Sequence, residues 1–195
     1  MMQTKSKSVE RGFTLIEVMI AIAVMSIGIL TLIAAFGAAI AATSTSQEDL
    51  IARQKALEAM ESIYTARNTQ QITFTQIANI ASGGIFTDGP TTMLSSGPDG
   101  LVNTADDVNF PASGVCPAGV ECIPLPGPDG ILGTADDKPM QLNNFTRQIQ
   151  INTVLDANGN LDTNLKQVVV TVTYTRIGMQ VPRTYTVNAL ISAYR

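Results

Sequence analysis

The stretch Arg11–Leu30, RGFTLIEVMIAIAVMSIGIL, decides the fold of this 195-residue chain. After its leading arginine it contains one charged residue, Glu17, and no further charge occurs from Val18 to Gln47. About 20 apolar residues span the hydrocarbon core of a bilayer, so this run is long enough to cross it as a helix. The first proline of the chain is Pro90, so no proline breaks the helix before it leaves the membrane. The sequence therefore predicts one membrane-spanning helix near the N-terminus.

The charges around this helix predict its orientation and raise a question about Glu17. Lys5, Lys7 and Arg11 precede the apolar run, and the positive-inside rule places them in the cytoplasm and the remaining chain outside. An ionised carboxylate within hydrocarbon costs about 3 kcal/mol, so Glu17 needs a cation nearby or a position at the interface. The positive end of its own helix at headgroup depth would also favour it.

The string Gly12-Phe13-Thr14-Leu15-Ile16-Glu17, behind a short basic leader, resembles the class III signal of type IV prepilins, including the pseudopilins of type II secretion. The resemblance implies that a prepilin peptidase removes residues 1–12 by cutting between Gly12 and Phe13, and methylates the new amino terminus. It also implies that Glu17 is an assembly residue, which pairs with the terminal amine of an adjacent subunit. Because its helix has no proline, the chain is more similar to minor pilins and minor pseudopilins than to many principal pilins.

Helical spacing continues beyond the membrane and predicts a helix over residues 13–67, of which 13–42 would lie in the membrane or in the core of a filament. An apolar face is expected at Leu50, Leu57, Met60 and Tyr64. Lys55 and Glu58 fall on the opposite side by this spacing, whereas Arg53 lies within the apolar stripe. The predicted apolar face would pack on a C-terminal sheet, as the resemblance to pilins implies.

Residues 68–144 are rich in Gly, Pro, Ser and Asp and are expected to be mostly loops. This region contains an internal repeat: GPDGLVNTADD at 97–107 and GPDGILGTADD at 127–137 match at eight of eleven positions. Each copy gathers several oxygen donors, which suits a calcium ion. The two candidate calcium sites consist of Asp99, Asp106 and Asp107, and of Asp129, Asp136 and Asp137.

Two observations limit the calcium hypothesis. The spacing of the aspartates is not that of an EF-hand loop, and aspartates in turns commonly accept hydrogen bonds from their own backbone. Calcium ligation and solvated turns therefore remain alternatives.

Between the copies, Cys116 and Cys122 are the only cysteines, and their spacing suits one small disulfide in an oxidising compartment. No histidine is present to complete a zinc site with them.

Residues 145–195 alternate apolar with polar side chains in three runs that begin at Phe145, Leu165 and Arg183. Asn158-Gly159 predicts the first turn and Gly178 marks the second, between Ile177 and Pro182. The runs predict an antiparallel meander. The expected fold class is α+β and pilin-like: a long N-terminal helix packed on a C-terminal antiparallel sheet, with a loop-rich middle.

Composition and the resemblance together favour a structural subunit over an enzyme. The chain lacks histidine, the usual general base at neutral pH, and has no basic stripe for nucleic acid. The leading hypothesis is a minor subunit of a type IV pilus or of a type II secretion-like filament, held in the inner membrane by one span before assembly. Its expected partners are other pilin subunits, the prepilin peptidase and the membrane. The alternative is a membrane-anchored binding module whose calcium-stiffened head recognises a surface or a secreted substrate. Whether the filament serves a pilus, secretion or DNA uptake is left open.

Overall fold

The computed structural model describes residues 12–175 and 181–194. These form two compact units, with the boundary between Ser46 and Gln47. A single helix, α1 (Leu15–Asn68), supplies all the regular structure of the first unit and the first element of the second. It confirms the long N-terminal helix, which begins two residues later and ends one residue later than expected.

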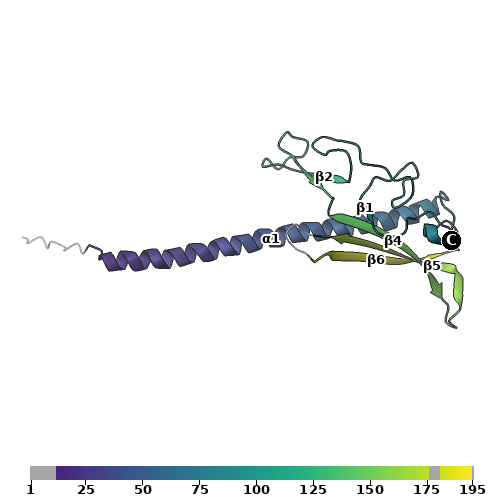
Figure 1. Cartoon of the computed structure of the whole chain (residues 1–195), viewed down its shortest axis with the longest axis horizontal. Coiled ribbons are helices and arrows are strands. Elements are labelled where there is room, and N and C mark those ends of the chain that lie inside the picture. Colours follow the sequence, from purple (N-terminus) through teal and green to yellow (C-terminus); the bar gives the residue numbers. More distant parts are fainter. Residues whose placement is uncertain (1–11, 176–180, 195) are drawn as a thin grey trace, which may run out of the picture. The chain divides into compact units, whose positions relative to one another are not determined.

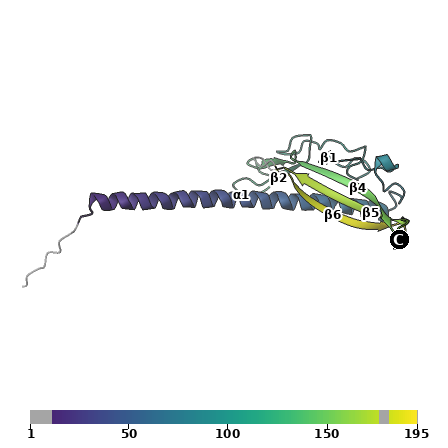
Figure 2. The ribbon, with the colours of Figure 1, turned by 60° about the horizontal axis from the view of Figure 1, so that its bottom comes forward.

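The main sheet lies in the second unit and contains four strands in the order β1-β4-β5-β6. β4 (Phe145–Leu155), β5 (Leu161–Tyr174) and β6 (Arg183–Ser192) form the predicted antiparallel meander. Figures 1 and 2 show these three strands side by side. The short strand β1 (Thr91–Thr92) adds to the outer edge of β4.

The turns and ends of the meander follow local backbone chemistry. Gly159 adopts a left-handed φ of 83° and its N–H donates to the carbonyl of Asp156 at 3.0 Å, so the predicted first turn is confirmed. β5 begins four residues earlier than expected, because pairing with β4 resumes beyond a register shift at Thr153 and Val154. The second predicted turn, around Gly178, falls outside the described residues.

Besides β1, the loop-rich middle contains one 3₁₀ turn and a small second sheet. A 3₁₀ turn, η1, spans Ile80–Ser82, and β2 (Cys122–Leu125) pairs antiparallel with β3 (Lys138–Gln141). The sequence pattern did not predict this hairpin, since each strand has four residues and contains a proline. The second copy of the aspartate repeat connects its two strands.

The core of the second unit lies between α1 and the sheet, and its helical face differs from the predicted one. The buried face of α1 is largely made of alanine, with Ala52, Ala56, Ala59 and Ala66 accompanied by Ile51, Met60 and Ile63. Of the predicted apolar face, Met60 is buried and Tyr64 packs against the core as a partly buried residue. The other two positions were wrong: Leu50 is 65% exposed and Leu57 is 44% exposed.

The error about the helix face has a physical cause. The small residues of α1 share one core cluster with residues of β4 and β5, and the larger leucines turn outward. Lys55, expected on the solvent side, is instead 7% exposed because it meets an acidic partner from a distant loop. A periodicity count that weighs leucine above alanine selects the wrong side of such a helix.

Candidate functional site

The first unit presents the start of α1, where the motif residues lie. Gly12 and Phe13 precede the helix, and the Phe13 side chain is 82% exposed. Thr14 caps the helix: the backbone N–H of Glu17 donates to the Thr14 hydroxyl at 3.3 Å and to its carbonyl at 3.1 Å. The Thr-x-x-Glu spacing before an apolar run is a capping-box signature that the sequence analysis missed. It fixes the point at which the helix begins.

Glu17 lies in the first turn of α1 and is exposed. Among the described residues, its carboxylate has no hydrogen-bond or ion-pair partner. The N-terminal end of the helix dipole favours a negative charge at this position. The carboxylate is therefore placed at a favourable point of its own helix and still has its full capacity to accept a charged partner.

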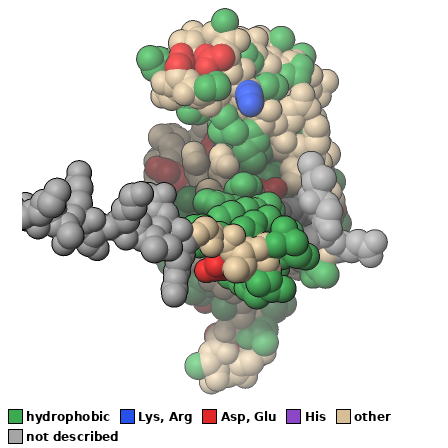
Figure 3. All heavy atoms as spheres, turned by 90° about the vertical axis from the view of Figure 1, so that its left-hand side faces the viewer, with side chains coloured by type: hydrophobic (Ala, Val, Ile, Leu, Met, Phe, Trp, Pro, Cys, Tyr) green, Lys and Arg blue, Asp and Glu red, His purple; other side chains and the backbone are tan. Residues whose placement is uncertain are grey.

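The apolar run of the first unit is exposed along its length. Fifteen large hydrophobic side chains from Leu15 to Ile40 are between 45% and 81% exposed. Figure 3 shows hydrophobic side chains gathered on this end of α1, at the centre of the view. α1 contains a stretch long and apolar enough to cross a membrane, and none of that stretch is buried among the described residues. Such a surface requires lipid or other helices around it.

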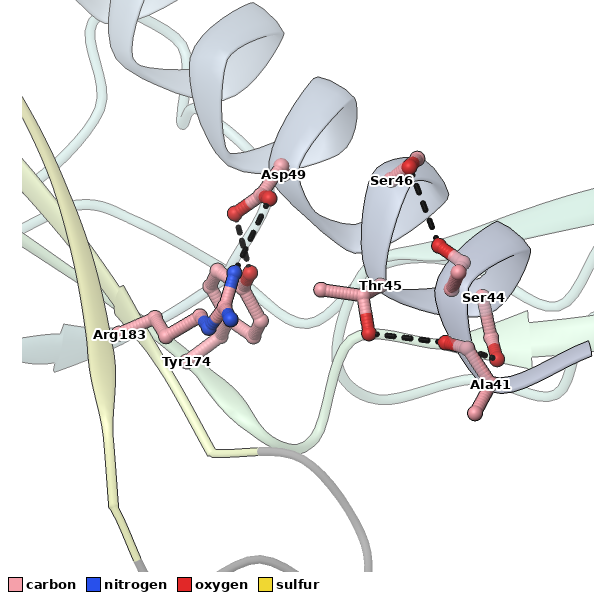
Figure 4. A network of polar contacts seen from close by, with 8 residues as sticks. Ala41, Ser44, Thr45, Ser46, Asp49, Tyr174 and Arg183 are labelled. Atoms are coloured by element: carbon pink, nitrogen blue, oxygen red, sulfur yellow. Dashed lines mark hydrogen bonds and ion pairs between the residues drawn. The ribbon is translucent and has the colours of Figure 1, made fainter. Parts of the chain in front are cut away.

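The few polar side chains of this run are satisfied within the helix. Ser26 donates to the Ile22 carbonyl at 2.7 Å, and Thr31 donates to the Gly28 carbonyl at 2.8 Å. Hydroxyls from Thr43 to Ser46 donate in the same way, and Figure 4 shows the bonds of Ser44, Thr45 and Ser46. Backbone acceptors one turn back thus spare these groups the cost of an unpaired hydroxyl in hydrocarbon.

The second unit begins with a polar contact between α1 and the sheet. Asp49 accepts a hydrogen bond from the Tyr174 hydroxyl and lies 3.3 Å from the Arg183 guanidinium (Figure 4). Burial and the Asp49 carboxylate raise the pKa of Tyr174 to about 12. The contact connects the first turns of the helix in this unit to the ends of β5 and β6.

A charged cluster, in which Lys55 and Glu121 are buried and Glu58 is exposed, lies between α1 and the loops of the second unit. Lys55 contacts the Glu121 carboxylate and lies 2.7 Å from Glu58. Burial alone would lower the pKa of Lys55, but its hydrogen bonds to Glu121 and Glu58 outweigh burial and raise it. Glu121 is held by backbone bonds to Met93 and Leu142, both 2.8 Å long. Nothing in the local sequence pattern signals this pairing, because its partners lie 66 residues apart.

The first aspartate loop, residues 97–107, packs into the second unit, which is called the head below. Leu101 is 1% exposed, and the side chain of Asn103 donates to the Thr91 hydroxyl at 2.7 Å and the Arg147 carbonyl at 2.9 Å. Asn103 also accepts from Nε of the buried Arg147 at 2.6 Å. Burial lowers the pKa of that guanidinium. This loop is therefore a structural part of the head core.

The second aspartate loop, residues 127–137, shares most of its internal bonds with the first but has a different environment. Its Asp129 accepts from the N–H of Ile131 at 2.9 Å, as Asp99 accepts from Leu101 at 2.8 Å in the first loop. Its Asp137 accepts a hydrogen bond from the backbone N–H of Gly133 at 2.7 Å. Ile131 is 60% exposed. Local sequence sets the loop conformation in both copies, whereas the surroundings differ.

The candidate calcium ligands of each loop come together, but as acceptors of the loop's own donors. Thr104 donates to Asp106 at 2.7 Å, and Thr134 donates to Asp136 at 2.6 Å. These bonds are the first cause of a lowered pKa at both Asp106 and Asp136. In the part of the chain that the structure describes, no group of three or more acidic or cysteine side chains is arranged to hold a metal ion. Calcium ligation stays a prediction, and the hydrogen bonds favour the turn alternative.

Cys116 and Cys122 form a disulfide, which closes the loop that leads into β2. No free cysteine occurs among the described residues. The disulfide fixes the approach of the chain to the β2–β3 hairpin and hence the base of the second aspartate loop.

Comparison with known proteins bears on the first unit. Residues 7–42 carry the prokaryotic N-terminal methylation motif. This motif is the class III signal of type IV pilins and pseudopilins. It indicates a structural subunit, implies processing by a prepilin peptidase and assembly with other pilin subunits, and with the apolar helix suggests a membrane anchor. No curated protein and no solved structure matches the chain.

Proposed function

We propose that this chain is a minor subunit of a type IV pilus or of a type II secretion-like filament. The observation that carries the proposal is the start of α1: a methylation motif leads directly into a helix whose apolar side chains are exposed over residues 15–40. Such a helix is stable in a bilayer, and it leaves the bilayer only where other apolar helices replace the lipid. A filament core provides that replacement.

Processing creates the second requirement for assembly. Cleavage between Gly12 and Phe13 leaves a positively charged amine about one helical turn from Glu17. The Glu17 carboxylate has no partner among the described residues, and its helix begins at the Thr14 cap. In the filament, Glu17 pairs with the terminal amine of a neighbouring subunit, which neutralises two charges in an apolar environment.

The orientation before assembly follows from the basic leader. Lys5, Lys7 and Arg11 keep the N-terminus in the cytoplasm, so the second unit lies in the periplasm, where its disulfide is stable. The subunit then moves from the inner membrane into the filament with the head on the filament surface.

Mass spectrometry of the mature chain together with filament fractionation tests this proposal. The mature protein is expected to start at Phe13 and to carry one methyl group on its terminal amine. Glu17→Gln keeps the side-chain size and removes the charge, and we expect at least about a tenfold loss of filament incorporation, because 1.4 kcal/mol corresponds to a factor of ten. Glu10→Gln is the matched control, since residue 10 is removed with the leader. Retention of residues 1–12, or normal incorporation of the Glu17→Gln chain, would contradict the proposal.

A further inference from the structure

The turn between β4 and β5 contains the one asparagine–glycine pair of the chain, Asn158-Gly159. All residues from 155 to 161 are exposed. Figure 1 shows the tip of this hairpin extending away from the rest of the sheet, below the β5 label. Water and dissolved bases therefore reach both residues of the pair.

A few local hydrogen bonds hold the pair in its turn. The N–H of Gly159 donates to the Asp156 carbonyl at 3.0 Å, and the N–H of Asp156 donates to the Asn160 carbonyl at 2.7 Å. The backbone N–H groups of Asn158 and Asn160 each donate to the Asp156 carboxylate at 2.8 Å. Water competes for bonds at an exposed tip, so freeing the Gly159 nitrogen from its bond slows any reaction there by only about tenfold.

Glycine leaves its own backbone nitrogen unhindered. Gly159 has no Cβ that would obstruct an approach of its nitrogen to the preceding side chain. Nothing lies within 4 Å of the place where a Cβ would be, so neighbouring groups do not hinder this nitrogen either. The side-chain amide carbon of Asn158 is separated from the nitrogen by a few bonds only, so the two can join in a small cyclic imide.

We propose that Asn158 is a site of spontaneous deamidation. The Gly159 nitrogen gives its proton to hydroxide or to a dissolved base and bonds to Cγ of Asn158. The bond from Cγ to Nδ2 then breaks, and Nδ2 takes up a proton and leaves as ammonia. Water opens the resulting succinimide either at Cγ, which gives aspartate, or at the main-chain carbonyl, which gives isoaspartate. The balance is one water consumed and one ammonia released, with no oxidation or reduction.

The fold confines the effect of this modification to the hairpin tip. Isoaspartate leads the main chain through an extra carbon, which displaces the N–H groups that donate to Asp156. The last two paired positions of β4 and β5 lie beyond a register shift between Thr153 and Val154, so the rest of the ladder does not depend on the turn. The modified chain therefore keeps its core. Deamidation does not require assembly, so its absence would leave the proposed filament function standing.

Peptide mapping of the full-length chain in detergent tests the site. The folded chain is incubated at mildly acidic and at mildly alkaline pH, and tandem mass spectrometry follows the tryptic peptide of residues 148–166. We expect a mass gain at position 158 that equals the exchange of NH2 for OH, in two products that separate by chromatography. The rate should rise with the hydroxide concentration, because the attacking nitrogen must lose its proton. An unmodified Asn158 after prolonged incubation at alkaline pH would overturn the proposal.

Two controls isolate the role of Gly159. Asn160 lies in the same peptide and at the same exposed tip but precedes Leu161, so its conversion should be at least about tenfold slower. Gly159→Asn adds a Cβ at a left-handed φ that asparagine tolerates, and it should slow conversion at position 158 about tenfold. Asn158→Asp supplies the reference for the aspartate product. Equal rates at positions 158 and 160, or an unchanged rate in Gly159→Asn, would contradict the assignment.

A comparison with the unfolded chain tests the contribution of the turn. The same incubation in concentrated urea removes the bond from Gly159 to Asp156, and we expect it to raise the rate at Asn158 by no more than about tenfold. A folded chain that reacts more than about a hundredfold more slowly than the unfolded chain would show that the turn protects Asn158, and the proposal would be wrong.

Discussion

The two aspartate loops of this protein have nearly the same sequence and share most of their internal hydrogen bonds, yet the first packs into the core and the second is exposed. Residues 97–107 pack into the head through Leu101 and Asn103, whereas residues 127–137 stand on a hairpin with Ile131 60% exposed. The comparison separates the conformation of a loop from its contribution to stability. The turn chemistry of Gly, Asp and Thr determines the conformation of the loop. The residues at the three differing positions and the surrounding chain determine what the loop contributes to stability.

The largest difference is expected at the third varied position, where the first loop has Asn103 and the second has Gly133. Asn103→Gly removes the bonds to the buried Arg147 carbonyl and the half-buried Thr91 hydroxyl, and the bond from Nε of Arg147, so we expect a loss of about 4 kcal/mol in the free energy of unfolding. Both positions have a left-handed φ, 60° and 89°, which glycine and asparagine tolerate. The reciprocal change, Gly133→Asn, places a side chain in open space at a left-handed φ, so it should cost about 1 kcal/mol, well below the loss from Asn103→Gly. Urea unfolding of the full chain in detergent measures both, and equal losses would contradict the assignment of Asn103 to the core.

The next difference concerns the apolar positions. Leu101→Ala empties a fully buried site and should destabilise the head by about 3 kcal/mol. Ile131→Ala removes a side chain that is mostly in water, so a change within about 0.5 kcal/mol is expected for the isolated subunit. Thermal unfolding followed through the strand signal in circular dichroism compares them. A large loss from Ile131→Ala in the monomer would mean that the second loop packs on its own chain.

Acid titration should distinguish the carboxylates within and between the loops. Hydrogen bonds from Thr104 and Thr134 lower the pKa of Asp106 and Asp136, whereas burial raises the pKa of Asp99. A carboxylate with a lowered pKa stabilises the folded state above its unfolded pKa of about 3.9, and that stabilisation is lost as the pH falls through the folded value. Asp99 has the opposite sign: its contribution is greatest below about pH 3.9 and is lost as the pH rises through its raised value. Carbon-detected NMR of the carboxyl groups checks the order, and an Asp99 that titrates below Asp106 would contradict it.

These comparisons also show what the sequence could predict. The long helix, the three strands of the meander and the disulfide follow from periodicity, β-branched runs and cysteine spacing, all of which are local. The start of the helix was also readable, because Thr14 and Glu17 have the spacing of a capping box. The buried face of α1 was not predictable from leucine periodicity, since alanines face the sheet and Lys55 is buried against Glu121. That pairing depends on a contact between distant parts of the chain, and no local pattern encodes it.

The same limit applies to the repeat, which the sequence identified but whose two environments it did not separate. Leu101 and Ile131 are equally apolar, so composition gives no reason for one to be buried. One difference between the copies is that Asn103 has a side chain that bonds Thr91 and Arg147, whereas Gly133 has none. One residue in the repeat is thus associated with a buried loop in one copy and an exposed loop in the other.

The smallest effect is expected from calcium, and it tests whether the loops share a function beyond their conformation. The carboxylates already accept hydrogen bonds from the backbone and from Thr104 and Thr134, so we expect millimolar calcium to shift the unfolding midpoint of the full chain by less than about 1 °C. A specific site occupied at 100 times its dissociation constant would instead stabilise the head by about 2.7 kcal/mol, which is a shift of several degrees. Asp107→Asn and Asp137→Asn form a matched pair, one in each loop. A calcium-induced shift that is abolished by one of these changes and kept in the other would place an ion in that loop and overturn the turn interpretation for it.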